Sequence, residues 1–205
     1  MTTKEMIRMR MNVMNHKIKK KIKILLCGGI LSLALSTQVY AADQIVDLTV
    51  AETFSSMDYQ KMAVSLAKQY PEIIKYEEIG KSYDQKPIYA IVLTHNADVL
   101  YGTPDFKVSR KHYLMEAGTH ARETANSGVL LKMVEEYARD YYDDSVIEGY
   151  NLRDILNTSA LHFVPMLNPD GHDLAKFGLS SIQTEAAKKA LQSMEDDNYG
   201  YWKAN

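Results

Sequence analysis

The strongest constraint on the fold is an alternation of segment types between residues 113 and 166. A short apolar run at 113–117 predicts a strand ending at Gly118, and a long amphipathic stretch from about 125 to 141 predicts a helix. A second apolar run at 161–166 predicts another strand. Strand, helix and strand in succession are typical of an α/β sheet domain, whose ligands bind beyond the carboxyl ends of the strands.

The flanking sequence adds further elements. Apolar residues at helical spacing from Ser56 onward predict a helix that stops at Tyr70-Pro71. Residues 74–79 and 87–94 predict a hairpin around a polar turn, residues 152–156 and 182–194 predict two more helices, and residues 42–50 predict an extended leader. The predicted buried stripe of the long helix consists of Val129, Leu130, Met133, Val134 and Tyr137.

The first 41 residues predict a secretory signal peptide. A lysine-rich segment precedes a twelve-residue, mostly apolar run at 24–35, and Ala41 offers a small residue for cleavage. The alternative is a membrane anchor, but a spanning helix needs about 20 apolar residues. We therefore expect a signal peptide at 1–41, a short leader at 42–55, one domain at 56–205, secretion, and no stable membrane span after cleavage.

Charge and cysteine content exclude several function classes. Residues 1–41 hold eight Lys/Arg and one acid, so the rest of the chain has 24 − 8 = 16 basic and 26 − 1 = 25 acidic residues, a charge of −9. Such a chain repels phosphate backbones, and we expect no nucleic-acid partner. The only cysteine, Cys27, lies in the predicted signal peptide. Any metal is therefore held by histidine and carboxylate side chains.

A candidate metal site follows the first predicted strand. His120 and Glu123 are three residues apart at a strand-to-helix junction, so both side chains can reach one cation. Imidazole and carboxylate suit zinc, and a catalytic zinc usually has three protein ligands and one water. The alternative is a solvated histidine beside a glutamate that favours the helix N-terminus.

The motifs around this pair resemble the zinc carboxypeptidase family, the carboxypeptidase A-type metallopeptidases. The sequence has His-Ala-Arg-Glu at 120–123, Asn-Pro-Asp-Gly at 168–171 and Trp-Lys-Ala-Asn at 202–205, in the family's order. The opening hairpin is also similar, so the resemblance covers about residues 56–205. It implies a mixed, mostly parallel central sheet flanked by helices, truncated at the C-terminus.

The resemblance implies roles for individual residues. His120 and Glu123 would bind one Zn2+ per chain, and Arg122 would line the substrate cleft, with a surface arginine as the alternative. Lys203 stands where the family usually has an arginine that polarises the scissile carbonyl, although it could equally be solvated. The turn at 168–171 would support the site rather than take part in catalysis.

Part of the family's machinery has no counterpart in this sequence. The third ligand, a histidine, and the general-base glutamate lie downstream of the Trp-Lys step in the family, where this sequence ends. No other histidine replaces the ligand: His162 is expected to be a hydrogen-bonded core residue, His172 an exposed one, and His95 and His112 show no partner pattern.

The resulting functional expectation is a zinc-dependent metallocarboxypeptidase that hydrolyses peptide bonds near the C-terminus of peptides. One alternative is a cell-wall stem-peptide (gamma-D-glutamyl-diamino acid) endopeptidase, as in some bacterial members of the family. Another is an inactive fragment or a non-enzymatic binding remnant. The expected partner is a peptide or cell-wall peptide substrate, and the chain is expected to be a monomer.

Overall fold

The computed structural model describes residues 44–194, all of which belong to one compact unit, Val39–Asn205. Residues 1–43 and 195–205 lie outside the described residues. The predicted signal peptide and the Trp-Lys step with Lys203 are therefore expectations from sequence alone.

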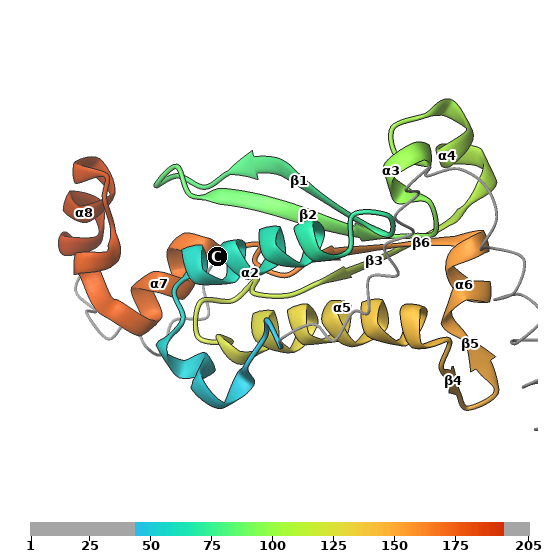
Figure 1. The fold of residues 1–205 in the computed structure, drawn as a ribbon. Helices are drawn as coiled ribbons and strands as arrows, with labels where there is room; N and C mark the ends of the chain where they lie inside the picture. Colours follow the sequence, from blue (N-terminus) through green and yellow to red (C-terminus); the bar gives the residue numbers. More distant parts are fainter. Residues whose placement is uncertain (1–43, 195–205) are drawn as a thin grey trace, which may run out of the picture. The chain divides into compact units, whose positions relative to one another are not determined.

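A four-stranded sheet forms the centre of the described unit (Figure 1). Its order is β1 (Ile74–Lys81), β2 (Pro87–Leu93), β6 (Ser159–Val164) and β3 (Lys111–Glu116). The mixed α/β architecture is confirmed. Parallel pairing is nevertheless the minority among these strands, because β2 pairs antiparallel with both neighbours and only β3 and β6 run parallel. The expectation of a mostly parallel sheet is wrong for this part of the chain, since its opening hairpin supplies two antiparallel ladders.

The opening helix α2 (Ser56–Gln69) confirms the sequence prediction. A capping box fixes its start, in which Ser55 and Asp58 satisfy each other's backbone N–H groups. It ends before Pro71, as proline requires. The leader differs from the prediction, because Leu48–Thr53 forms a 3-10 helix, η1, whose first turn is capped by the Asp47 carboxylate.

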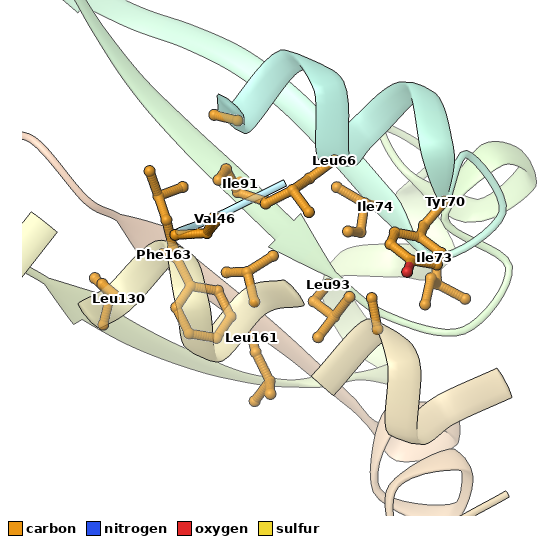
Figure 2. Packing of buried hydrophobic residues seen from close by; sticks show 14 of the residues in the cluster. Val46, Leu66, Tyr70, Ile73, Ile74, Ile91, Leu93, Leu130, Leu161 and Phe163 are labelled. Atoms are coloured by element: carbon orange, nitrogen blue, oxygen red, sulfur yellow. The ribbon is translucent and has the colours of Figure 1, made fainter. Parts of the chain in front are cut away.

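Helix α5 (Ala125–Asp143) packs with α2 on one face of the sheet and completes the main core. Figure 2 shows Leu66 of α2 and Leu130 of α5 among sheet residues such as Phe163. Leu131, Val134 and Ala138 are also buried, whereas the predicted core residue Val129 is 49% exposed. The prediction of Val129 is wrong because the buried positions of α5 are 127, 128, 130, 131, 134, 135, 138 and 141, a stripe that does not include position 129.

The other face of the sheet carries a smaller apolar cluster. Two short helices, α3 (Ala97–Leu100) and α4 (Pro104–Ser109), connect β2 to β3. Phe106 of α4 packs on Val92 and Ala160 of the sheet. Thr103 caps α4 and Pro104 occupies its first turn, a local start signal.

The remaining elements lie toward the two ends of the sheet. The hairpin of β4 (Val146–Ile147) and β5 (Tyr150–Asn151) leads into α6 (Leu152–Thr158). Helix α7 (Pro169–Phe177), the 3-10 turn η2 (Gly178–Ser181) and α8 (Glu185–Gln192) gather near the β1–β2 turn (Figure 1). Within residues 44–194, no helix is long and apolar enough to cross a bilayer.

Candidate metal and substrate site

The candidate zinc-binding motif lies in the loop after β3. The loop leaves the sheet at Gly118, whose φ is +65° and whose added Cβ would lie 2.9 Å from Ser127 Oγ and 3.3 Å from Met166 Cα. Only glycine tolerates both the left-handed backbone and this close approach. Gly118 therefore turns the chain from β3 toward the start of α5.

His120, Arg122 and Glu123 then share one tight turn. The Glu123 N–H donates to the His120 carbonyl oxygen at 3.1 Å. His120 and Glu123 are half-buried, whereas Arg122 is exposed. The three residues thus lie in a single turn immediately before α5 begins at Ala125, and their binding of a metal stays a prediction.

The Asn-Pro-Asp-Gly motif forms the first turn of α7. Asn168 is the N-cap and its Oδ1 accepts from the Gly171 N–H at 2.9 Å, while Pro169 occupies the first turn. An added Cβ at Gly171 would lie 2.5 Å from Asn168 Nδ2, so the capping side chain occupies the space that a larger residue would need. The motif therefore begins a helix, whereas its composition predicts only a turn.

The two motifs are joined directly. The Asn168 N–H donates to the Gly118 carbonyl at 2.9 Å, and Asn168 Nδ2 donates to the Thr119 carbonyl at 3.3 Å. Both motifs follow parallel neighbouring strands, β3 and β6, so they emerge at the same edge of the sheet. Asn168 thereby caps α7 and anchors the loop that carries His120.

A buried ionic group, the Lys86 cluster, supports this edge; it consists of Lys86, Asp84, Asp170 and Asp173. Lys86 Nζ lies 2.8 Å from Asp173 Oδ2, 3.8 Å from Asp84 Oδ2 and 3.9 Å from Asp170 Oδ1. The side chains of Lys86, Asp84 and Asp173 are almost wholly buried. The cluster ties the β1–β2 turn to α7. Sequence reasoning missed it, because a Ser-Tyr-Asp-Gln-Lys turn has the composition of a solvated loop.

The acidic members of the cluster have further partners. Asp173 accepts from the backbone and hydroxyl of Ser56 at 2.7 Å each, and Asp170 accepts from Ser82 Oγ at 2.8 Å. Asp84 accepts from the N–H groups of Gln183 and Thr184. Burial opposes ionisation of Asp84, but the hydrogen bonds from Thr184 and Gln183, together with Lys86, outweigh it and lower its pKa.

A hollow of about 300 Å³ lies beside both motifs. Ala121 of the candidate zinc-binding motif and Asn168 of the capping motif contribute to its wall. Its other lining residues come mainly from the β1–β2 turn, α7 and α8: Tyr83, Asp84, Asp170, Gly171, Leu174, Ile182, Ala187, Ala190 and Leu191. The hollow thus combines apolar side chains with two carboxylates next to the candidate metal turn.

The donor chemistry of the turn fits zinc but does not complete a site. His120 and Glu123 offer one imidazole and one carboxylate, two of the three protein ligands that a catalytic zinc usually has. Within residues 44–194, no three His, Cys, Asp or Glu side chains lie close enough together to hold an ion. The third ligand would have to come from outside these residues.

The other described histidines have structural environments. His172 is buried and its Nε2 donates to the Phe54 carbonyl at 3.2 Å, so the expectation that it is exposed is wrong: it lies on the inner side of α7. Burial lowers the pKa of its imidazole. His95 pairs with the Tyr141 hydroxyl, and His112 with His162, partners that no local sequence pattern indicates. His162 is half-buried and hydrogen-bonded; burial, and secondarily His112, lowers its pKa.

The profile of the zinc carboxypeptidase family matches residues 59–198. The chain belongs to this family. The match includes both motifs and every element from α2 to α8 except the first residues of α2. Zinc and a hydrolytic, peptide-cleaving chemistry are what membership of the family implies.

Individual relatives support the assignment. The chain is 26% identical over 151 residues to gamma-D-glutamyl-L-diamino acid endopeptidase 1 of Lysinibacillus sphaericus, covering 72% of this chain and 35% of that protein. It is 26% identical over 113 residues to human carboxypeptidase D, covering 55% of this chain and 7% of that protein. The structure of carboxypeptidase A from Helicoverpa armigera matches with a TM-score of 0.50 and 20% identity, over 70% of this chain and 31% of that one, which supports the fold. The chain thus spans about a third or less of these relatives.

Proposed function

We propose that this chain carries the metal-binding part of a zinc-dependent peptidase site, with His120 and Glu123 as two zinc ligands. The observation that carries the proposal is the turn at the end of β3 that holds His120 and Glu123 three residues apart, with Arg122 exposed between them, and that Asn168 anchors. Zinc bound there would polarise a peptide carbonyl and activate a water molecule.

The chain's own residues would position the substrate. Arg122 is exposed beside the ligand pair, and its planar guanidinium can hold a carboxylate or a peptide carbonyl through two parallel hydrogen bonds. The apolar wall of the adjacent hollow, including Leu174 and Ile182, would exclude water from one side of the bound peptide. Lys203, which lies outside the described residues, would add positive charge near the scissile carbonyl.

The first candidate reaction is removal of residues from the C-terminus of peptides. Membership of the zinc carboxypeptidase family and the similarity to carboxypeptidase D support it. Export through a signal peptide at 1–41 and a monomeric state remain part of this proposal.

The second candidate is cleavage of the gamma-D-glutamyl-diamino acid bond in cell-wall stem peptides. The L. sphaericus relative supports it, because that similarity extends over more of this chain than the similarity to carboxypeptidase D does. The two reactions use the same metal ligands and differ in which groups of the substrate are bound around them.

Zinc affinity and hydrolysis of the full 205-residue chain test the proposal. We expect the chain to bind zinc and Glu123→Gln to weaken this binding at least tenfold. Glu136→Gln is the control, because it removes an exposed carboxylate of α5 that is not a proposed ligand. Release of the last residue from an N-blocked dipeptide supports the first reaction, and cleavage of a gamma-D-glutamyl-diaminopimelyl peptide supports the second. Zinc binding that is unchanged in Glu123→Gln would contradict the proposed site, and zinc binding with neither hydrolysis would contradict both reactions for this chain.

A further inference from the structure

Two imidazoles face each other on the sheet face opposite the main core. His112 of β3 and His162 of β6 project from neighbouring parallel strands, and His112 Nδ1 lies 2.8 Å from His162 Nε2. Phe106 packs edge-on against the His112 ring with centroids 5.1 Å apart. Two rigid strands and a buried aromatic ring therefore hold both imidazoles in place.

The outer nitrogen of His112 identifies its tautomer. Nε2 lies 3.3 Å from the Phe106 carbonyl oxygen, which can only accept, so Nε2 carries the hydrogen. In the neutral ring Nδ1 then presents a lone pair toward His162. Histidines that bind metals commonly donate their other ring N–H to a backbone carbonyl in this way.

The spacing of the facing nitrogens matches that of two ligands on one ion. Nitrogens about 2.0–2.1 Å from a metal, at angles between square-planar and tetrahedral, lie about 2.9–3.3 Å apart. The observed separation of 2.8 Å between His112 Nδ1 and His162 Nε2 would have to widen only slightly. His162 must move its hydrogen from Nε2 to Nδ1, a tautomer change of the neutral ring that releases no proton to solvent.

The surroundings offer space and an acidic neighbour. The pair lines a hollow of about 560 Å³ together with Glu77, Tyr101, Gly102, Phe106 and Lys107. The Glu77 carboxylate accepts from the Tyr101 hydroxyl, and its negative charge favours a cation. Lys107 is exposed, so its ammonium group can extend into solvent. No third protein ligand joins the pair within the described residues, and water would fill the remaining positions.

We propose that His112 and His162 bind one divalent transition-metal ion of the Ni2+, Cu2+ and Zn2+ group. Imidazole nitrogen suits these ions. The site shares no residue with the His120–Glu123 turn, so it stands whether or not the chain is a peptidase. Its expected role is to clamp β3 to β6 and α4.

Calorimetric titration of the full chain with Ni2+ tests the proposal. We expect His112→Gln and His162→Gln each to weaken one binding event by about 10- to 100-fold, a loss known even for outer-shell partners of metals. His95→Gln is the matched control and should bind as the wild type does. His120→Gln should keep this binding event. Equal Ni2+ binding by the wild type and both His112 and His162 variants would overturn the proposal, as would loss of the event in His120→Gln.

A second measurement needs no substitution and covers the case in which a variant fails to fold. The chain has six histidines, and paramagnetic Ni2+ broadens the imidazole signals nearest to it in spectra of 15N-histidine-labelled protein. Broadening of the His112 and His162 signals at the lowest Ni2+ ratios supports the site. Broadening that spares this pair overturns it.

Discussion

The two motifs at the edge of the sheet differ in how they are held. The Asn-Pro-Asp-Gly turn is fixed by its own cap and by the buried Lys86 cluster, whose three carboxylates have several donors each. The His120–Glu123 turn is more open: its Arg122 is exposed, and His120 and Glu123 are half-buried. One motif therefore stabilises the edge of the sheet, and the other presents an exposed arginine at the place where we propose that a metal and a substrate bind.

The largest loss of stability should come from disrupting the Lys86 cluster, which supports the Asn-Pro-Asp-Gly motif. Lys86→Met leaves buried Asp84 and Asp173 without their cation, and we expect the free energy of unfolding to fall by about 3–5 kcal/mol. Urea denaturation measures it. The control is Lys61→Met, whose side chain is 73% exposed in a surface pair with Asp58 and should change stability by less than about 1 kcal/mol. Equal losses in the two variants would contradict the account.

A smaller loss of stability is expected when the Asn168 cap of α7 is disturbed. Gly171→Ala drives a methyl group into the Asn168 side chain and displaces the cap of α7, which should cost about 1–2 kcal/mol. Gly80→Ala is the control, because no atom lies within 4 Å of its added Cβ. Thermal unfolding of both variants checks this, and a stable Gly171→Ala protein would show that the cap does not fix the motif.

The pH dependence of stability should also arise near the Asn-Pro-Asp-Gly motif, at His172 of α7. Burial lowers the pKa of His172, so the unfolded chain binds a proton more readily than the folded one. Stability from this group is present above about pH 6.5 and is lost as pH falls from there through the lowered pKa, with a slope of at most about 1.4 kcal/mol per pH unit. His172→Gln should reduce that slope in urea unfolding between pH 7.5 and 5. An unchanged slope would argue against this assignment.

The smallest effect on stability is expected from a substitution of Arg122 in the His120–Glu123 turn. Arg122→Gln removes an exposed side chain and should change the free energy of unfolding by no more than about 0.5 kcal/mol. Its effect should appear instead as weaker substrate binding, measured as a raised KM or Kd for a peptide. A large loss of stability would mean that Arg122 belongs to the support and not to the accessible side.

Local patterns predicted the elements whose causes are local. The α2 cap and Pro71 stop, the hairpin and the strand–helix–strand order all follow from neighbouring residues. That His120 and Glu123 bind one metal ion stays a prediction. The misses arise from long-range contacts. Nothing near Lys86 or Asp84 in the sequence shows that α7 and α8 will cover them, and His172 is buried only because Asn168 starts a helix where a turn was expected.

The central claim is that the His120–Glu123 turn binds zinc and that the neighbouring Asn-Pro-Asp-Gly motif supports this turn. The most direct test is the zinc dissociation constant of the full chain and of Glu123→Gln, both in a His162→Gln background so that the second proposed site does not contribute. The account predicts at least tenfold weaker zinc binding in Glu123→Gln with an unchanged urea midpoint. Equal zinc affinity in the two proteins would contradict it.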